Sequence, residues 1–246
     1  MNIAVIFAGG TGSRMHSKEK PKQFLEMNNK PIIIHTIEHF ENHPLIDAII
    51  VVCIESWIEH FQNLIYKYRL NKIKEVVSGG LTGQLSIFNG LCAANEFAVK
   101  QKDENTIVLI HDGVRPLINE KVITDNINSV LKHGSAITTA IVNETILVVN
   151  DGTATIDYVP SRKNSRVAKA PQSFYLKDIL KVHKQCMADG EDNCIDSCTM
   201  MQKYGYNLFL IDGPIENTKI TTPEDFYIMR AILEAKENEQ IYGFIN

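Results

Sequence analysis

The sequence predicts an α/β protein whose core is one mostly parallel β-sheet with helices on both faces. Short apolar runs rich in β-branched residues alternate with segments of helical periodicity along the 246 residues. Most of these runs are apolar throughout rather than at every second position, which is typical of central strands buried on both faces. Because crossover helices join parallel strands, the alternation favours a mostly parallel sheet.

Six apolar runs are the predicted strands. They span residues 3–7, 48–54, 76–77, 106–111, 136–142 and 208–211. Helical periodicity, with an apolar stripe along one face, is present in residues 31–40, 84–98 and 120–131. A last helix is expected over about 224–235, because Thr222 is a good N-cap and Pro223 is suited to the first helical position.

One segment departs from this alternation. Two extended runs within residues 146–159 flank the pair Asp151-Gly152. Such a pair is a strong hairpin signal, since both central residues of a type I′ turn need positive φ. A two-stranded ribbon has no core of its own. We therefore expect a protruding β-hairpin arm at about residues 144–162, which packs on another surface such as that of a second subunit.

The composition fits one well-buried core. The chain is 44% hydrophobic and 22% charged, which argues against a disordered, collagen-like or disulfide-scaffold protein. The length suits one α/β domain. Since no repeat, low-complexity tract or Pro/Gly/Ser linker divides the chain, residues 1–246 are expected to form a single domain that carries the arm.

Charge and hydropathy exclude several classes of partner. Twenty-five Lys and Arg against 29 Asp and Glu leave a net charge of −4, which does not favour nucleic acid or an anionic membrane. The longest apolar stretches, such as residues 46–54, fall well short of the roughly 20 residues that span a bilayer. Residues 1–7 lack a basic leader and a cleavage site and begin a strand instead. We expect a cytoplasmic protein without nucleic-acid or membrane partners.

The five cysteines fit reduced thiols in a reducing compartment. Cys194 and Cys198 are four residues apart and could share a helix face, with His183 and two aspartates nearby in the sequence. As a zinc site this set is incomplete, because structural zinc takes four ligands and the chain offers no second pair. Buried thiols are the favoured interpretation.

A glycine-rich loop follows the first predicted strand. Residues 8–15 are Ala-Gly-Gly-Thr-Gly-Ser-Arg-Met, at the carboxyl end of the strand, where open α/β sheets bind ligands. Glycines let backbone N–H groups approach an anion closely. The loop is neither a Walker A loop nor a dinucleotide fingerprint. Two cations, Arg14 and Lys22, suit a polyphosphate, although a solvated loop with glycines for tight turning would have the same composition.

Three further segments offer groups for binding. Gly79-Gly80 and Ser86 lie in a turn that leads into a helix, where glycine and an N-cap would be needed anyway. Asp112 ends a predicted strand and is well placed to bind a divalent cation against nucleotide phosphates, while Arg115 could pair with it or reach a phosphate. His111 is expected to be a hydrogen-bonded structural residue. Lys219 and Thr221 are not required by the helix start that follows them.

The motifs of the chain, and the order in which they follow one another, resemble those of the CTP-dependent cytidylyltransferases that act on polyol phosphates. This family includes 2-C-methyl-D-erythritol 4-phosphate and ribitol-5-phosphate cytidylyltransferases, and the resemblance runs from Ile3 to about Ile232. The motifs are AGGTGSRM at 8–15, PKQF at 21–24, GG at 79–80 with Ser86, DGVRP at 112–116, APQSF at 170–174 and NTKITTPED at 217–225. The resemblance implies a Rossmann-like nucleotidyltransferase fold, with a homodimer formed through the arm.

The resemblance also implies a role for individual residues. The group expected to line the cytidine and triphosphate pocket is Ala8, Gly9, Gly10, Gly12, Gly80 and Ser86. The catalytic cations are expected to be Arg14, Lys22 and Lys219, and Asp112 is expected to place Mg²⁺ or another divalent cation. Positions that bind the polyol phosphate or support the site in the family are matched by Arg115, Thr145, Arg162 and Thr221. The reaction is attack by a polyol phosphate oxygen on the α-phosphorus of CTP, which gives a CDP-polyol and pyrophosphate.

Two departures from the family pattern bear on the acceptor. The methylerythritol enzymes commonly have Thr-Pro-Gln where this chain has Ala170-Pro171-Gln172, and Thr-Asp-Glu where it has Ile195-Asp196-Ser197. The loss of two hydroxyl groups indicates a different polyol, and the Thr-Thr-Pro that follows Lys219-Ile220 favours the ribitol branch. D-Ribitol 5-phosphate is the expected acceptor, which would give CDP-ribitol for cell-wall or capsule polymers.

Three alternatives stay open from the sequence. One is methylerythritol phosphate cytidylyltransferase of isoprenoid synthesis. Another is a sugar-1-phosphate nucleotidyltransferase, for whose usual second domain the chain has little length. The third is a catalytically inactive nucleotide-binding protein, which the presence of Arg14, Lys22, Asp112 and Lys219 argues against.

Overall fold

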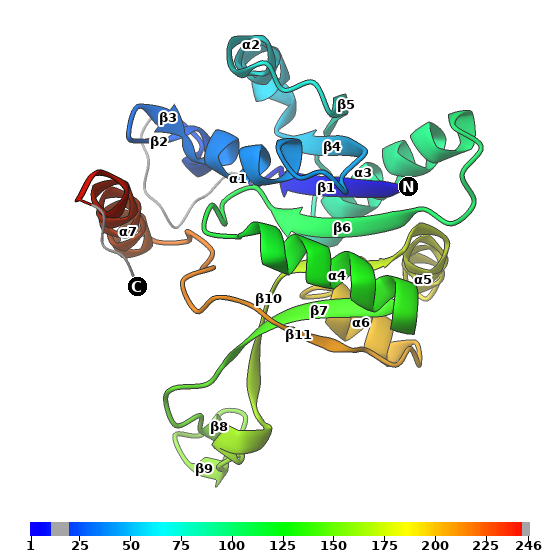
Figure 1. The fold of residues 1–246 in the computed structure, drawn as a ribbon. Coiled ribbons are helices and arrows are strands. Elements are labelled where there is room, and N and C mark those ends of the chain that lie inside the picture. The colour runs from blue at the N-terminus through cyan, green and yellow to red at the C-terminus, as the bar shows by residue number, and fades with distance from the viewer. Residues whose placement is uncertain (11–19, 243–246) are drawn as a thin grey trace.

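The computed structural model describes residues 1–10 and 20–242, and in this part of the chain the central feature is a seven-stranded sheet (Figure 1). Its strand order is β11-β7-β10-β6-β1-β4-β5. The strands are β1 (Asn2–Ala8), β4 (Ala48–Cys53), β5 (Ile73–Ser78), β6 (Ile107–Asp112), β7 (Ser135–Ile141), β10 (Arg166–Tyr175) and β11 (Leu210–Asp212). The pairs β1–β4, β1–β6, β4–β5 and β7–β11 are parallel, which confirms the predicted fold class.

Strand β10 is the one member of the sheet that the sequence did not indicate. It runs antiparallel between β6 and β7, and its register shifts between Ala168 and Gln172. Pro171 lies at this irregularity, which explains how a proline is accommodated in a central strand. The polar Ser173 is buried because its hydroxyl donates to Asn126 Oδ1 at 2.9 Å. A segment that contains Pro171 and Ser173 does not have the continuous apolar pattern that identifies a buried strand in the sequence.

Helices cover both faces of the sheet. They are α1 (Ile32–Glu41), α2 (Ile58–Tyr68), α3 (Gly83–Lys100), α4 (Glu120–His133), α5 (Leu176–Ala188), α6 (Ser197–Lys203) and α7 (Pro223–Tyr242). One face packs on α1, α2 and α4, and the other packs on α3, α5 and α6. Alternate residues of β1 supply the two cores, since Ala4 and Ile6 face the first and Ile3 and Val5 face the second.

The predicted helix boundaries follow from capping. Thr82 accepts from Leu85 N at the start of α3, and Asn119 accepts from Val122 N at the start of α4. Helix α7 begins at Pro223, as predicted, and Asp225 closes its first turn by accepting from Thr222 N at 2.8 Å. Its base packs on an apolar cluster that includes Ile220 and Met229. Within the described part of the chain, no helix combines the length and the apolar character that crossing a membrane requires.

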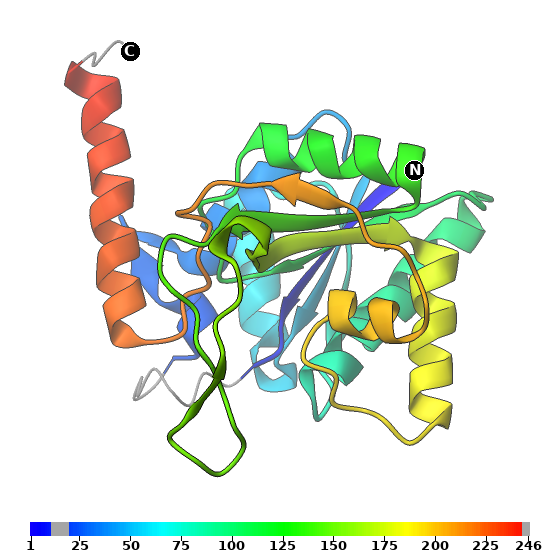
Figure 2. The same ribbon diagram turned by 90° about the horizontal axis from the view of Figure 1, so that it is seen from below.

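A hairpin arm extends from the sheet, as Figures 1 and 2 show. Its strands, β8 (Val148–Val149) and β9 (Ile156–Tyr158), pair antiparallel, and a second small ribbon joins β2 (Glu26–Met27) to β3 (Lys30–Pro31). The predicted type I′ turn is wrong in detail. Gly152 has φ +71° but Asp151 has no positive φ, and Thr153 N donates to Asn150 O at 3.2 Å, which fits a type II turn.

Candidate active site

The carboxyl ends of the parallel strands β1, β4, β5 and β6 lie along one edge of the sheet, and two cavities open there. The first, of about 470 Å³, lies beside the glycine loops and is called the glycine cavity; its described lining is Phe7, Ala8, Gly9, Gly10, Lys22, Gln23, Gly80, Leu81, Thr82, Gly83, Ser86, Asp112, Val114 and Lys219. The second, of about 300 Å³, is called the side cavity and lies between β6, β10 and helices α3, α5 and α6. Phe7, Gly83, Asp112 and Lys219 line both.

The two glycine loops pack closely against each other. A Cβ on Gly9 would lie 3.3 Å from Gly79 Cα, and a Cβ on Gly80 would lie 2.5 Å from Leu85 Cβ. Packing therefore requires glycine at position 80, and at position 9 it leaves little room for a larger residue. A Cβ on Gly10 would meet nothing within 4 Å, so its backbone faces the open glycine cavity. Gly12 and Arg14, the other predicted members of this loop, lie outside the described residues.

Ser86 closes the second glycine turn. Its hydroxyl donates to Thr82 O at 2.9 Å and accepts from Gly80 N at 3.0 Å. The hydroxyl proton is thus used inside the loop, while the residue still lines the glycine cavity. Its first role is to fix the turn that shapes the cavity.

Gln23 and Lys22 fix the first glycine loop and the loop before α7. Gln23, which is buried, donates from Nε2 to Ala8 O at 2.6 Å. The neighbouring Lys22 donates from Nζ to Ile220 O at 2.9 Å and lines the glycine cavity. The Pro-Lys-Gln-Phe motif therefore supplies both a cation and the support of the strand end. The sequence pointed to Lys22 but not to this use of Gln23.

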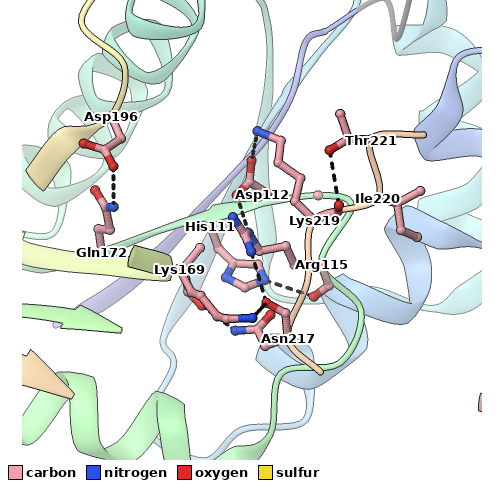
Figure 3. A network of polar contacts seen from close by, with 12 residues as sticks. His111, Asp112, Arg115, Lys169, Gln172, Asp196, Asn217, Lys219, Ile220 and Thr221 are labelled. Carbon is pink, nitrogen blue, oxygen red and sulfur yellow. Dashed lines mark hydrogen bonds and ion pairs between the residues drawn. The ribbon is translucent and has the colours of Figure 1, made fainter. Parts of the chain in front are cut away.

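Asp112 lies at the junction of the two cavities between two cations (Figure 3). Its Oδ2 accepts from Arg115 Nε at 2.7 Å, and its Oδ1 lies 2.5 Å from Lys219 Nζ. Burial opposes ionisation of this carboxyl, but Lys219 and Arg115 outweigh it and keep the pKa of Asp112 well below its ordinary value. Asp112 is therefore a carboxylate at every physiological pH.

Arg115 and Lys169 converge on one backbone carbonyl. Arg115 Nη1 donates to Asn217 O at 3.0 Å, and Lys169 Nζ donates to the same oxygen at 3.2 Å and to Ile215 O at 2.7 Å. Asn217 is fully buried and donates from Nδ2 to Ala170 O at 2.7 Å. Burial, helped by Arg115, lowers the pKa of the Lys169 ammonium. These contacts attach the loop before α7 to β6 and β10, and Figure 3 shows Arg115 and Lys169 meeting at Asn217.

The two predicted substrate residues of the main body have structural contacts of their own. Arg115 pairs with Asp112, as the ion-pair alternative proposed, and also lines the side cavity. Thr221 Oγ1 donates to Lys219 O at 3.2 Å, and Thr221 N donates to Asp225 Oδ2 at 2.8 Å. Thr221 therefore shapes the loop that carries Lys219. Its predicted contact with substrate stays a prediction.

Thr145 and Arg162 come together on the arm. Arg162 Nη2 donates to Thr145 Oγ1 at 2.9 Å, and both side chains are exposed. Neither residue is among the described lining of the glycine cavity or the side cavity. Because the arm extends away from the sheet (Figures 1 and 2), neither residue is brought to the two cavities of its own chain, and their contact with substrate stays a prediction.

His111 has the structural role predicted for it. It is fully buried on β6, and its Nε2 donates to Arg115 O at 3.2 Å. Burial lowers the pKa of the imidazole to about 3, so the ring is neutral at physiological pH. It supports the turn that positions Arg115.

The cysteines are free thiols whose neighbours differ from those expected. Cys194 precedes α6 and does not share its face with Cys198; its Sγ lies 3.5 Å from Cys186 Sγ. The Cys198 thiol donates instead to Asp196 Oδ1 at 3.3 Å. Cys186, Cys194 and Glu191 place their ligand atoms within 4.8 Å of one another. The Cys186 thiol donates to Glu191 O, and the Glu191 carboxylate pairs with Lys203, so these groups have partners within the protein.

Asp112 also fits a magnesium ion brought in with a nucleotide. It is the one carboxylate in the described lining of the glycine cavity. Mg²⁺ is commonly bound by one or two carboxylates together with substrate phosphates, and each oxygen of Asp112 keeps a lone pair beyond its contact with a cation. The donor set therefore suits a nucleotide-borne hard cation better than a dedicated metal site.

Comparisons with known proteins agree over nearly the whole chain. The family model for IspD, 2-C-methyl-D-erythritol 4-phosphate cytidylyltransferase, matches residues 2–235. A ribitol-5-phosphate cytidylyltransferase of Vibrio parahaemolyticus is 54% identical over 243 residues, covering 99% of this chain and 100% of the relative. A 2-C-methyl-D-erythritol 4-phosphate cytidylyltransferase of Clostridium acetobutylicum is 40% identical over 238 residues, covering 95% and 98%. The solved 4-diphosphocytidyl-2C-methyl-D-erythritol synthase of Anaerococcus prevotii aligns with a TM-score of 0.80 at 27% identity, covering 95% of this chain and 96% of that one.

Proposed function

The chain belongs to the IspD family of cytidylyltransferases, and on that premise we propose that it transfers the cytidylyl group of CTP to D-ribitol 5-phosphate. The products are CDP-ribitol and pyrophosphate. The general activity, nucleotidyl transfer, follows from the family; the acceptor is the part that is proposed.

One observation carries the proposal. The glycine cavity and the side cavity meet at Asp112 and Lys219, so two ligands bound in them would touch at one charged pair. The glycine cavity offers backbone groups and Lys22, which suits a triphosphate. The side cavity is lined by three cations, Arg115, Lys169 and Lys219, against the carboxylates of Asp112 and Asp196. This excess of positive charge suits an acceptor that carries a phosphate dianion.

The chemistry at the junction requires charge and alignment. An oxygen of the acceptor phosphate attacks the α-phosphorus of CTP, a new P–O bond forms, and the bond to the leaving pyrophosphate breaks. Both reactants are anions, so Lys219 and Lys22 lower the barrier by stabilising charge in the transition state. A phosphate dianion needs no general base, which agrees with a neutral, buried His111.

A divalent cation, which we propose to be Mg²⁺, would be held by Asp112 together with the nucleotide phosphates. It would supply additional neutralisation of the triphosphate charge. In the protein itself, Asp112 keeps Arg115 and Lys219 in place, because its one carboxylate contacts both cations.

The choice of ribitol 5-phosphate rests on the wall of the side cavity. Ala170 and Ile195 line it, so it lacks the two hydroxyl groups that methylerythritol enzymes commonly supply at the matching positions. The relatives that are 54% identical carry the ribitol name, whereas the first methylerythritol relative is 40% identical. Transfer to 2-C-methyl-D-erythritol 4-phosphate is the second candidate, favoured by the family model.

The proposal includes a homodimer formed through the arm. The arm exposes apolar side chains that its own ribbon does not cover, namely Ile146, Leu147, Val149, Ile156, Tyr158 and Val159. Burying them against a second copy would remove this surface from water and could bring Thr145 and Arg162 to the other copy's site. The free cysteines and the substrate CTP fit a cytoplasmic enzyme.

The experiment is to incubate the protein with CTP, Mg²⁺ and ribitol 5-phosphate and to identify the products by mass spectrometry. CDP-ribitol and pyrophosphate in equal amounts are expected. A Lys22→Ala variant should form neither at an appreciable rate and should keep its fold by circular dichroism. Formation of no CDP-ribitol by the wild type, or near-normal turnover by Lys22→Ala, would remove the proposal.

A further inference from the structure

The side cavity has an inner wall whose described residues include no cation, away from its cationic end. This wall is formed by the start of α3, by α5 and by the segment that leads into α6. His183 projects from α5, and Ser197 is the first residue of α6. Both line the side cavity and are almost completely buried, with exposed fractions of 1% and 3%.

The polar atoms of these two side chains lack partners within the described chain. Neither His183 Nδ1 nor His183 Nε2 has a hydrogen bond to any described residue, and the same is true of Ser197 Oγ. Buried polar groups in folded proteins are almost always hydrogen-bonded, because leaving one unpaired costs free energy. Three such atoms in the wall of one cavity leave hydrogen-bonding capacity that a polar ligand in this cavity could use.

The chemistry of the wall indicates which part of a ligand it binds. Burial lowers the pKa of His183 to about 4, so its ring is neutral at physiological pH and offers one donor and one acceptor. A serine hydroxyl also both donates and accepts. Alcohol hydroxyl groups match such partners, whereas a phosphate dianion is better matched by Arg115 and Lys219 at the other end.

The other groups on this wall already have partners. Asp196 accepts from Gln172 Nε2 at 3.2 Å and from Thr199 N at 2.8 Å. Gln84 accepts from Cys194 N at 2.7 Å and donates to Glu191 O at 3.0 Å. Phe88 packs against the His183 ring at a centroid distance of 5.8 Å and offers no hydrogen bond to it. His183 and Ser197 are thus the groups of this wall whose bonding capacity is left for a ligand.

We propose that His183 and Ser197 bind the hydroxyl chain of the acceptor at the end distant from its phosphate, and that His183 determines the preference for a long polyol. This inference rests on the proposed function and assigns the residues that recognise its acceptor. Because Ala170 and Ile195 supply no hydroxyl, recognition of the chain passes to His183 and Ser197. Sites built to hydrogen-bond a hydroxyl discriminate strongly against an analogue that lacks it.

The main test is the variant His183→Leu, assayed by pyrophosphate release. Leucine fills a similar volume and removes both ring nitrogens. We expect the KM for ribitol 5-phosphate to rise at least tenfold while the KM for CTP stays within twofold. The thermal unfolding midpoint should stay equal or rise, because the ring nitrogens have no partner to lose in the free protein. Ser197→Ala should show the same pattern with a smaller rise.

His43→Leu is the matched control. His43 is also buried, but its Nε2 lies 3.2 Å from Glu120 O and 3.1 Å from Thr124 Oγ1, on the opposite face of the sheet from the side cavity. This variant should lower the unfolding midpoint and leave the acceptor KM unchanged. His183→Leu is thus expected to raise the acceptor KM without lowering the unfolding midpoint, and His43→Leu to lower the midpoint without raising the acceptor KM.

A shortened acceptor tests which part of the ligand the wall contacts. sn-Glycerol 3-phosphate keeps the phosphate but lacks the distal hydroxyl groups, and its inhibition constant can be measured against ribitol 5-phosphate. His183→Leu should weaken binding of ribitol 5-phosphate much more than binding of glycerol 3-phosphate. A residue with only a structural role would weaken both alike.

Two results overturn the inference while leaving the proposed function intact: an unchanged acceptor KM in His183→Leu, or equal losses for both acceptors and CTP with a lowered unfolding midpoint. If the wild type uses only 2-C-methyl-D-erythritol 4-phosphate, the ribitol assignment and the preference for a long polyol both fail. A wild type that is inactive with both acceptors removes the proposed function and this inference together.

Discussion

Replacing Lys219 with methionine should separate the charge of this residue from its contribution to folding. The substitution keeps an unbranched side chain that can still pack near the Phe7 ring, whose centroid lies 5.6 Å from Nζ. Lys219 is 39% exposed, and Asp112 keeps its hydrogen bond to Arg115 at 2.7 Å when the ammonium is gone. No buried charge is left unpaired, so the free energy of unfolding should change by about 1 kcal/mol or less.

The effect on catalysis should be much larger. Lys219 is at the junction of the two cavities, where the attacking phosphate and the α-phosphate of CTP would meet. Removing one preorganised charge of this kind costs roughly 10²- to 10³-fold in rate. Pyrophosphate release at saturating CTP and acceptor measures this loss, and urea unfolding measures the stability.

Lys121→Met provides the control for this prediction. Lys121 also pairs with an aspartate, Asp125, but on the exposed face of α4, where 79% of its side chain is accessible. It should change neither activity nor stability appreciably. A Lys219→Met enzyme that keeps more than a tenth of wild-type turnover would refute the placement of the reaction at this junction.

Three further predictions follow from individual contacts. Asp112→Asn removes the negative charge that pairs with Arg115, whose side chain is 14% exposed, and should lower the free energy of unfolding by about 3 kcal/mol in urea titrations, whereas a loss below about 1 kcal/mol would contradict a buried ion pair. Acid should destabilise the protein between about pH 6.5 and pH 4, because burial lowers the pKa of His183 in the folded chain to about 4, so that only the unfolded chain binds a proton at this histidine in that range. The free energy of unfolding should fall by about 1.4 kcal/mol per pH unit for each such group. A stability that does not change with pH in this range would be inconsistent with a neutral imidazole. Ile156→Lys places a charge on the apolar arm and should shift the sedimentation behaviour from dimer to monomer with loss of turnover, while an unchanged sedimentation coefficient would argue against the arm as the interface.

Much of the fold could be predicted because its strands are locally distinct. The buried runs of β1, β4 and β6 are continuous and apolar, and nothing but a central strand accommodates them easily. Strand β10 could not be recognised in this way. Pro171 and Ser173 are tolerated there by a register shift and by a hydrogen bond to Asn126, both of which depend on neighbours distant in sequence.

The residues of the candidate site also fall into those that a sequence motif identifies and those that only the tertiary structure reveals. Lys22, Asp112 and Lys219 lie in motifs with a clear chemical purpose, and the structure brings all three to the glycine cavity. Lys169 and His183 were not recognised as site residues, because a single lysine in a strand or a histidine on a helix has no local signature. Their roles come from the tertiary structure that surrounds the side cavity.

Ser86 shows the opposite limit. The sequence resemblance placed Ser86 in the nucleotide pocket, and the structure uses its hydroxyl to close the turn from Gly80 to Thr82. A motif can thus identify the correct cavity while leaving open whether a given atom touches the ligand or shapes the loop around it.

The most direct test of the account is the ratio of kcat/KM for ribitol 5-phosphate to kcat/KM for 2-C-methyl-D-erythritol 4-phosphate, measured with CTP and Mg²⁺ by pyrophosphate release. The absence of hydroxyl groups at Ala170 and Ile195, together with the wall formed by His183 and Ser197, predicts a ratio of at least about 10², because a site built to hydrogen-bond a substrate hydroxyl discriminates by more than this against an analogue that lacks it. A ratio below one would contradict the account and identify the protein as a methylerythritol phosphate enzyme.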